Sequence, residues 1–409
     1  MAGELAVWLY EQCVALIDRD RDRLRLTYTD EALDRYPLGS PLLSLSMPVG
    51  NRRYTQGIVR PFLDGLLPEG DSRAAIARDV GVSPTDTYGL IRELGRDCAG
   101  AIVVQPAEQS RPQRPTTTTA EPLDDETLAR LVGGLRSAPL GVDGRVRISL
   151  AGVQEKLVLT KLADGRWGRP VDGTPSTHIL KPEIATFPHT VQNEAFCMRV
   201  ARYLGLVAAN VETTQVGNRQ MIVVERFDRR VIANSDVERI HQEDFCQATG
   251  IAPEAKYEAN GGPSLRRIAG ILGEVAEAGS VDRLLAATTV NALLGNGDAH
   301  AKNFSLLHNP SGALTLAPLY DLVSTLYYGD DRLAMYVDNV RRIDRVTVTR
   351  LVNEAVSWGV ARDRATGVIG ELLDKAPEAI ERARDETADL PAGVVGAVEH
   401  QLQQLRSEG

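Results

Sequence analysis

The chain has few of the residues that build redox or transition-metal sites. Its 6 histidines include no HxH or HxxxH pair, whereas a zinc site needs several His or Cys ligands. Its 4 cysteines include no CxxC pair; they are Cys13, Cys98, Cys197 and Cys246. These absences argue against a metallohydrolase and against a disulfide scaffold. We expect the cysteines to be buried, inert thiols in a reducing compartment.

The sequence also lacks long apolar segments. No stretch approaches the ~20 apolar residues that a membrane-spanning helix needs. The N-terminus, Met1 to Leu5, has no basic segment ahead of an apolar core, so it does not resemble a secretory signal. The overall balance, 43% hydrophobic and 25% charged, is typical of globular proteins. We therefore expect a cytoplasmic, soluble protein whose 409 residues form two or three domains.

Positive charge is not in excess. The chain has 46 Lys and Arg against 55 Asp and Glu, a formal net charge of −9. Such a protein repels a phosphate backbone, so DNA binding by the chain alone is not expected. An acidic chain can still dock against a basic partner.

One change in composition predicts how the chain is divided. Residues 105–122 are rich in Pro, Gln, Ser and Thr and almost free of large apolar groups, so they predict an exposed linker. The region before it, 1–104, has the pattern of a small α+β module. Its expected elements are a hairpin from strands 5–10 and 14–18, helices at 73–80 and 88–94, and a buried strand at 99–104.

The region after the linker is first β-rich and then helical. This order predicts a β-rich lobe at 123–240 and a helical lobe at 241–409, with a ligand site in the cleft between them. Its expected elements are strands at 146–150, 157–162, 177–180 and 220–225, a helix at 191–204, a helix capped by Ser280, and largely helical structure over the last sixty residues.

The densest polar segment follows the helix that begins near Ser280. Asp298 and Asn303 have the D-x4-N spacing of a kinase catalytic loop, in which the Asp orients the attacking hydroxyl and the Asn holds Mg²⁺. Asp321 lies 18 residues after Asn303, behind a short apolar run, where a kinase places a second metal-binding Asp. The alternative is that Asp321 caps a helix beginning at Leu322.

Other segments fit a nucleotide site less specifically. Lys181 ends an apolar strand, from which a lysine can reach ATP phosphates, although a strand-end lysine can also extend to solvent. Residues 148–156 occupy the place of a phosphate-covering loop, yet neither GxGxxG nor GxxxxGK[ST] is present. Residues 223–228 join the two predicted lobes, where backbone groups pair with adenine in kinases. No GxSxG elbow is present, which argues against a serine hydrolase.

Eight ordered motifs together carry a resemblance. They are 61–70 (PFLDGLLPEG), 95–102 (GRDCAGAI), 148–156 (ISLAGVQEK), 176–181 (STHILK), 224–229 (VERFDR), 242–247 (QEDFCQ), 296–303 (NGDAHAKN) and 320–322 (YDL). On these motifs the chain resembles, along nearly its whole length, the HipA family of toxin kinases from HipBA-type toxin–antitoxin modules. The resemblance implies an α+β, bilobal, protein-kinase-like fold with an N-terminal β-rich accessory module and a mostly helical C-terminal lobe.

The resemblance also implies roles for individual residues. Asp298 would be the catalytic Asp, which also contacts the nucleotide, with His300 and Gln242 supporting the catalytic centre. Asn303 and Asp321 would hold Mg²⁺. Lys181 would contact the ATP phosphates, and backbone groups at Glu225 and Phe227 would receive the adenine. Ser149 would be the autophosphorylated serine of a loop that also contributes Ala151, Gly152, Gln154 and Lys156 to the ATP site.

The function implied is that of an ATP- and Mg²⁺-dependent serine/threonine kinase that is a toxin. The family phosphorylates aminoacyl-tRNA synthetases, with glutamyl-tRNA synthetase the favoured target, and so causes growth arrest and persistence; phosphorylation of Ser149 would inactivate the kinase. A small basic HipB-like antitoxin would be the partner and would bring the chain to DNA indirectly.

Two alternatives stay open. One is a degenerate kinase that acts as an antitoxin-binding transcriptional co-repressor; the intact Lys181, Asp298, Asn303 and Asp321 argue against it. The other is a kinase for a small molecule, against which the long N-terminal module is a weak argument.

Overall fold

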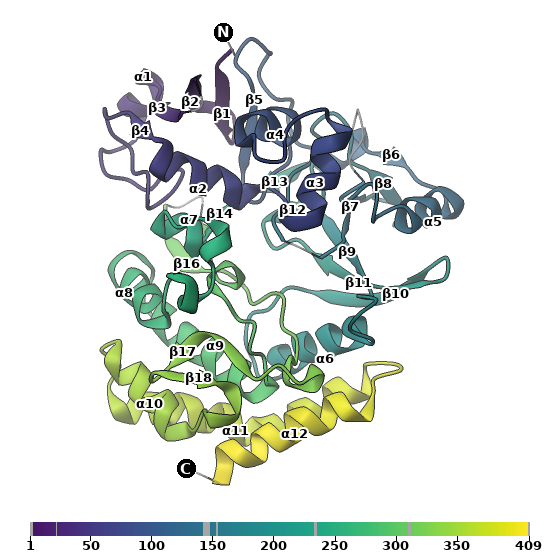
Figure 1. Ribbon diagram of the computed structural model, residues 1–409, viewed down its shortest axis with the longest axis vertical. Helices are drawn as coiled ribbons and strands as arrows, with labels where there is room; N and C mark the ends of the chain where they lie inside the picture. The colour runs from purple at the N-terminus through teal and green to yellow at the C-terminus, as the bar shows by residue number, and fades with distance from the viewer. Residues whose placement is uncertain are drawn as a thin grey trace. The chain divides into compact units, whose positions relative to one another are not determined.

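The computed structural model describes residues 3–21, 23–141, 148–152, 154–232, 235–309 and 312–407. The chain forms two compact units (Figure 1). Unit 1 comprises Met1–Pro182, Gln215–Arg219 and Glu225–Glu254, and unit 2 comprises Glu183–Thr214, Gln220–Val224 and Ala255–Gly409. These units follow spatial contacts rather than composition, and the boundaries drawn above at 104, 122 and 240 stay predictions.

Unit 1 begins with a five-stranded antiparallel sheet in the order β4-β3-β2-β1-β5. Alternating apolar residues build it: in β1, Leu5, Val7 and Leu9 are almost completely buried. The predicted hairpin is confirmed, since β1 and β2 pair antiparallel with Leu5 opposite Ile17. The strands are β1 (Leu5–Leu9), β2 (Gln12–Asp20), β3 (Arg23–Tyr28), β4 (Tyr54–Thr55) and β5 (Ile102–Pro106).

Four helices, α1 to α4, accompany this sheet. The amphipathic α2 buries Phe62 and Leu63 and packs against β3, while α4 packs against β5. The helices predicted at 73–80 and 88–94 are confirmed as α3 and α4, and the strand predicted at 99–104 is confirmed as β5, which begins three residues later. The bounds are α1 (Asp30–Arg35), α2 (Gln56–Leu66), α3 (Gly70–Asp79) and α4 (Thr87–Leu94).

The remaining strands of unit 1 follow residues 105–122. Most of that segment is exposed, but its first two residues end β5 and its last two form β6. Four strands pair in the order β6-β8-β7-β9. They are β6 (Glu121–Pro122), β7 (Leu157–Lys161), β8 (Trp167–Arg169) and β9 (His178–Pro182); α5 (Asp125–Gly133), the hairpin β12 (Arg229–Val231) and β13 (Val237–Arg239), β14 (His241–Asp244) and α7 (Phe245–Thr249) complete the unit.

The strand predicted at 146–150 is wrong over the part that is described. Residues 142–147 lie outside the described residues, and Ile148 makes a single parallel bridge to Asp97 instead of a ladder. The apolar alternation of this segment is satisfied by burial of Ile148 and Leu150 in the core next to the first sheet.

Unit 2 is mainly helical. The helix α11 packs against α6, α9, α10 and α12 (Figure 1), and 11 of the 15 residues of α9 are buried. The helix predicted at 191–204 and the helical C-terminal end are confirmed. The helices are α6 (Thr190–Tyr203), α8 (Leu265–Val275), α9 (Ser280–Leu294), α10 (Val348–Ser357), α11 (Arg362–Asp385) and α12 (Ala392–Ser407).

Two short hairpins extend unit 2. β15 (Ser305–His308) pairs with β16 (Leu314–Leu316), and β17 (Arg332–Val337) pairs with β18 (Val340–Arg342). The neighbouring strands β10 (Val211–Val216) and β11 (Arg219–Glu225) each contain residues of both units. The predicted capping role of Ser280 is wrong, because Gly279 takes the cap position with φ +86° and Ser280 is the first helical residue.

All four cysteines are described, and none of them forms a disulfide. Cys98, Cys197 and Cys246 are buried, whereas Cys13 is only half-buried, so the expectation of four buried thiols is wrong at that position. Burial raises the pKa of the Cys98 thiol to about 12, which keeps it protonated and unreactive. None of the helices within the described ranges combines the length and the apolar character that a membrane span requires.

Candidate active site

The loop after α9 has a closely determined path. The helix ends because Gly295 adopts φ +66°, and two residues later the Gly297 amide donates to Thr325 Oγ1 at 2.9 Å. The Gly297 carbonyl accepts from the Ala334 amide at 2.7 Å. A Cβ at Gly297 would lie 2.3 Å from the Arg332 carbonyl oxygen, so only glycine fits. This constraint fixes the position of the next residue, Asp298.

Asp298 is exposed, and its carboxylate accepts a hydrogen bond from a side chain. The Tyr257 hydroxyl donates to Asp298 Oδ1 at 2.9 Å. The pKa of Asp298 is raised, chiefly because the surrounding protein partly desolvates the carboxylate. The hydrogen bond from Tyr257 and the positive charge of Lys256 act to lower this pKa, and the negative charge of Asp321 acts to raise it. The result is an exposed carboxylate that is oriented through Oδ1.

His300 is 7% exposed, and its amide donates to the Asp298 carbonyl at 2.8 Å. Its ring packs edge-on against Tyr257, with ring centroids 5.4 Å apart. Burial, with the positive charge of Lys256, lowers the pKa of His300 to about 3, so the imidazole is neutral near pH 7. The His300 carbonyl accepts from the Asn303 amide at 2.8 Å, which closes the 3-10 turn Ala301–Asn303.

That turn brings Asn303 to Asp321. Asn303 Nδ2 donates to Asp321 Oδ2 at 3.2 Å, and Asp321 adopts φ +60°, which is uncommon for a residue other than glycine. No helix begins at Leu322 in this described stretch, so the helix-cap alternative for Asp321 is wrong. Unit 2 therefore brings Asp298, His300, Asn303 and Asp321 into one small group.

Asn303 and Asp321 fit a magnesium ion. Asn303 Oδ1 is buried and has no hydrogen-bond partner among the described residues, which is costly unless a ligand compensates. An amide oxygen beside a carboxylate is the type of oxygen donor set that Mg²⁺ prefers.

In unit 1, the residues predicted to contact ATP phosphates lie on β9 and on the loop before β7. Lys181 is the fourth residue of β9, and Gln154 Nε2 donates to the carbonyl of the next residue, Pro182, at 3.2 Å. Lys156 Nζ donates to the Ala151 carbonyl, so the loop folds back on itself. Gly152 has φ +116°, a conformation that requires glycine.

Ser149 is completely buried. Its hydroxyl donates to the Leu66 carbonyl at 2.7 Å, and its amide donates to the Asp97 carbonyl at 3.0 Å. The Glu69 amide donates to the Gly152 carbonyl at 3.3 Å. The described part of this loop is therefore hydrogen-bonded to the last residue of α2, to the segment after α2 and to the segment after α4.

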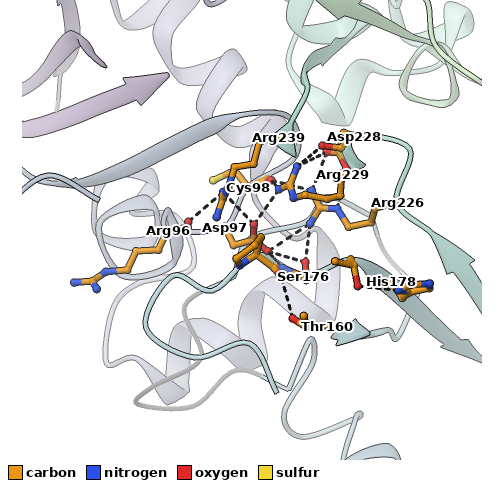
Figure 2. Close-up of polar contacts among 12 residues, drawn as sticks. Arg96, Asp97, Cys98, Thr160, Ser176, His178, Arg226, Asp228, Arg229 and Arg239 are labelled. Atoms are coloured by element: carbon orange, nitrogen blue, oxygen red, sulfur yellow. Dashed lines mark hydrogen bonds and ion pairs between the residues drawn. The ribbon is translucent and has the colours of Figure 1, made fainter. Parts of the chain in front are cut away.

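Glu225 and Phe227, predicted to receive adenine, flank a buried side chain at the end of β11. Glu225 is exposed and Phe227 is half-buried, whereas Arg226 points inward. Arg226 belongs to a buried ion cluster (Figure 2). We define the buried ion cluster as Asp97, Arg226, Asp228, Arg229 and Arg239, each less than 8% exposed. Gln242, predicted to support catalysis, donates from Nε2 to Asp228 Oδ2 at 3.0 Å.

Sequence reasoning missed Tyr257 and the buried ion cluster. Tyr257 lies in a polar stretch with no motif, so nothing in the sequence marked it. The cluster had a signal, because Arg226, Asp228 and Arg229 follow directly after the apolar strand β11. Such alternation of opposite charges beside a buried strand indicates paired, buried ions.

These observations define the class of protein. An Asp on a constrained loop, followed by an Asn that contacts a second Asp, is the arrangement of catalytic and metal-binding residues in kinases. A family model described as HipA-like C-terminal domain matches residues 148–380, and one described as HipA N-terminal domain matches residues 5–105.

Individual relatives agree with these family models. The chain is 39% identical over 407 residues to the "Putative kinase Y4mE" of Sinorhizobium fredii, covering 94% of this chain and 93% of that protein. It is 33% identical over 343 residues to the "Serine/threonine-protein kinase toxin HipA" of Shewanella oneidensis, covering 80% and 77%.

A solved structure agrees over almost the whole chain. It is the complex of HipA, HipB and operator DNA from Shewanella oneidensis MR-1, matched with a TM-score of 0.83 at 30% identity, covering 99% of this chain and 96% of that one. The chain therefore belongs to the HipA family, and it is a kinase toxin with that family's α+β, kinase-like fold. The resemblance stated from the sequence motifs is confirmed.

Proposed function

We propose that this protein is a Mg²⁺- and ATP-dependent serine/threonine kinase that phosphorylates a protein target and thereby halts translation and growth. The observation that carries the proposal is the contact between Asn303 and Asp321 next to the loop of Asp298, with Asn303 Oδ1 buried and unpaired among the described residues. Membership of the HipA family supports the same conclusion.

The residues of unit 2 would perform the transfer step. Asp298 accepts a hydrogen bond from the attacking hydroxyl and orients it, while Tyr257 holds the Asp298 carboxylate in place. His300, neutral and buried, supports the loop of Asp298 by packing against Tyr257. Asn303 and Asp321 would hold Mg²⁺, which when bound supplies positive charge to the transferring phosphoryl group.

The residues of unit 1 would bind the nucleotide. Lys181 contacts the ATP phosphates, and the loop residues Ala151, Gly152, Gln154 and Lys156 cover them. Backbone groups of Glu225 and Phe227 receive the adenine, and Gln242, which donates to Asp228, supports the catalytic centre. These roles rest on the family resemblance, on the position of Lys181 on β9 and on the exposure of Glu225 at the end of β11.

We propose that the kinase inactivates itself by phosphorylating Ser149. Because the Ser149 hydroxyl is completely buried against the Leu66 carbonyl, it cannot be phosphorylated in this arrangement. The loop must first leave its site, and a phosphate on Ser149 would prevent its return because a doubly charged group cannot be buried without partners. Phosphorylation would therefore hold the loop away from the nucleotide.

The proposed protein substrate is an aminoacyl-tRNA synthetase, with glutamyl-tRNA synthetase favoured on family resemblance. The proposed partner is a small, basic HipB-like antitoxin in the cytoplasm, which would bring the chain to DNA indirectly. The related Shewanella oneidensis structure contains HipA, HipB and operator DNA, and the net charge of −9 suits a basic partner. The alternative, a co-repressor without kinase activity, predicts antitoxin binding with no phosphoryl transfer.

The test is intact-mass analysis and peptide mapping after the purified protein is incubated with Mg²⁺ and ATP, beside an Asp298→Asn control. One phosphoryl group on Ser149 in the parent protein, and none in the control, is the expected result. If dephosphorylated parent protein gains no mass and transfers no phosphate to purified synthetases, the kinase proposal fails and the co-repressor function is favoured. A phosphate that maps to another residue would refute the role of Ser149 alone.

A further inference from the structure

Asp97 occupies the centre of the buried ion cluster and is completely buried (Figure 2). Its Oδ1 accepts from Arg229 Nη2 at 2.9 Å and pairs with Arg239 Nη1 at 3.1 Å. Its Oδ2 accepts from the Ser176 amide at 2.9 Å and from the Ser176 hydroxyl at 2.6 Å. Asp97 lies between α4 and β5 of the N-terminal module. Both oxygens of its carboxylate thus contact residues far along the chain.

The backbone of Asp97 holds a third segment. Its carbonyl accepts from the Ser149 amide at 3.0 Å, and Asp97 forms a parallel bridge with Ile148. One residue of the N-terminal module therefore contacts the beginning of the phosphate-covering loop, the residue two positions before β9, which carries Lys181, and the segment that follows β11.

The rest of the cluster fixes the segment after β11. Arg226 binds both oxygens of Asp228, at 2.9 and 2.8 Å, and Asp228 Oδ2 also accepts from the Gly100 amide at 2.7 Å. The Arg226 amide donates to the Thr177 carbonyl at 2.9 Å. Phe227 lies between two residues whose side chains are anchored in this way, so its backbone has little freedom to move.

We propose that Asp97 is a positioning residue for nucleotide binding: it sets the relative places of the loop of Ser149, of β9 and of the segment Glu225–Phe227. The N-terminal module is then a structural part of the nucleotide site rather than only a docking surface. This inference rests on the proposed function, because it takes these three segments as the ones that contact ATP. It also requires that loss of Asp97 weakens the binding of adenosine as well as of ATP, because the segment after β11 would contact the adenine.

A second buried carboxylate of the same module supplies a matched control. Asp64 is 5% exposed and accepts from Arg73 Nη2 at 2.8 Å and from Thr87 Oγ1 at 2.7 Å. These partners of Asp64, together with Arg60, lie within residues 60–87, so Asp64 serves the module itself. Loss of either carboxylate destabilises the protein, but only loss of Asp97 should disturb the three nucleotide-binding segments.

The experiment measures binding of ATP and of adenosine by isothermal titration calorimetry, without metal, to the parent chain and to the Asp97→Asn and Asp64→Asn variants. For Asp97→Asn we expect the dissociation constants of both ligands to rise by the same factor, about tenfold, as the binding-competent arrangement becomes less populated. For Asp64→Asn we expect parent-like constants. Lys181→Ala should weaken ATP alone, because adenosine has no phosphate.

Each outcome decides the proposal. The proposal would be overturned by equal dissociation constants for the parent chain and Asp97→Asn. It would also be overturned if Asp97→Asn and Asp64→Asn lost affinity for the ligands to the same extent. If Asp97→Asn does not fold, Ser176→Ala takes its place: this variant removes the hydroxyl contacts to Asp97 and to Arg226 and keeps the amide contact to Asp97, so weaker adenosine binding supports the proposal and unchanged binding overturns it. If the parent chain binds neither ligand, the proposed function itself fails, and this inference fails with it.

Discussion

Replacing Asp228 by asparagine should destabilise the protein strongly. Asp228 is 2% exposed and accepts from Arg226, from the Gly100 amide and from Gln242. An asparagine side chain at this position would keep one acceptor oxygen but would turn an amide NH₂ group toward the Arg226 guanidinium, leaving that buried positive charge only its more distant pair with Asp97 at 3.5 Å. Removing one partner of a buried ion pair costs about 3–5 kcal/mol.

The assay is thermal unfolding of Asp228→Asn at neutral pH, beside a surface control. For a cooperative unit of roughly 150–250 residues each kcal/mol changes Tm by roughly 2–4 °C, so we expect a fall of about 10 °C. The control is Glu238→Gln, which breaks the solvent-exposed pair with Arg230 on the same hairpin of β12 and β13, and it should change Tm little.

The same variant has an expected pH dependence. Burial by itself would raise the pKa of Asp228, but the Arg226 and Arg229 guanidinium groups hold that pKa well below its usual range. A carboxylate with a lowered folded-state pKa adds stability that is fully present above its unfolded pKa, about 4, and is lost as the pH falls toward the folded value. The Tm difference between parent and variant should therefore be largest above about pH 5 and should shrink below about pH 4. A difference under about 2 °C at pH 7, or one that grows on acidification, would refute the reasoning.

Three further predictions concern the active site. Tyr257→Phe removes a hydrogen bond to the Asp298 carboxylate, worth about 1.5 kcal/mol, so kcat for phosphoryl transfer should fall about tenfold with little change in Tm; unchanged kcat would contradict the orienting role. Gly297→Ala places a Cβ against the Arg332 carbonyl oxygen, so transfer measured by phosphate incorporation should be lost almost completely, and an active variant would show that the loop can relax. Asp321→Ala should abolish transfer and toxicity while leaving metal-free ATP binding intact, and binding lost without metal would argue that Asp321 acts on the fold instead.

Local patterns in the sequence determined much of the fold. The hairpin of β1 and β2, the helices α3, α4 and α6 and the helical C-terminal end follow from apolar periodicity, which depends only on residues near in the chain. The same holds for the loop of Asp298 and Asn303, where glycines and polar residues are adjacent in sequence. The sequence predicts the cap of α9 at Ser280, one residue too late, because glycine and serine are both acceptable caps. The left-handed backbone of Gly279, φ +86°, and not a side-chain preference, decides between them.

Contacts between distant residues were decided only by the tertiary structure. Asp97 and Arg229 are separated by 132 positions, and Ser149 and Leu66 by 83, and no periodicity links such pairs. The sequence alone therefore identified the residue types of a kinase site and the order in which they occur. The packing of the chain then decided which carboxylates are buried with arginines, that Ser149 is inaccessible, and that Tyr257 orients Asp298, because burial and pairing depend on which segments the folded chain brings together.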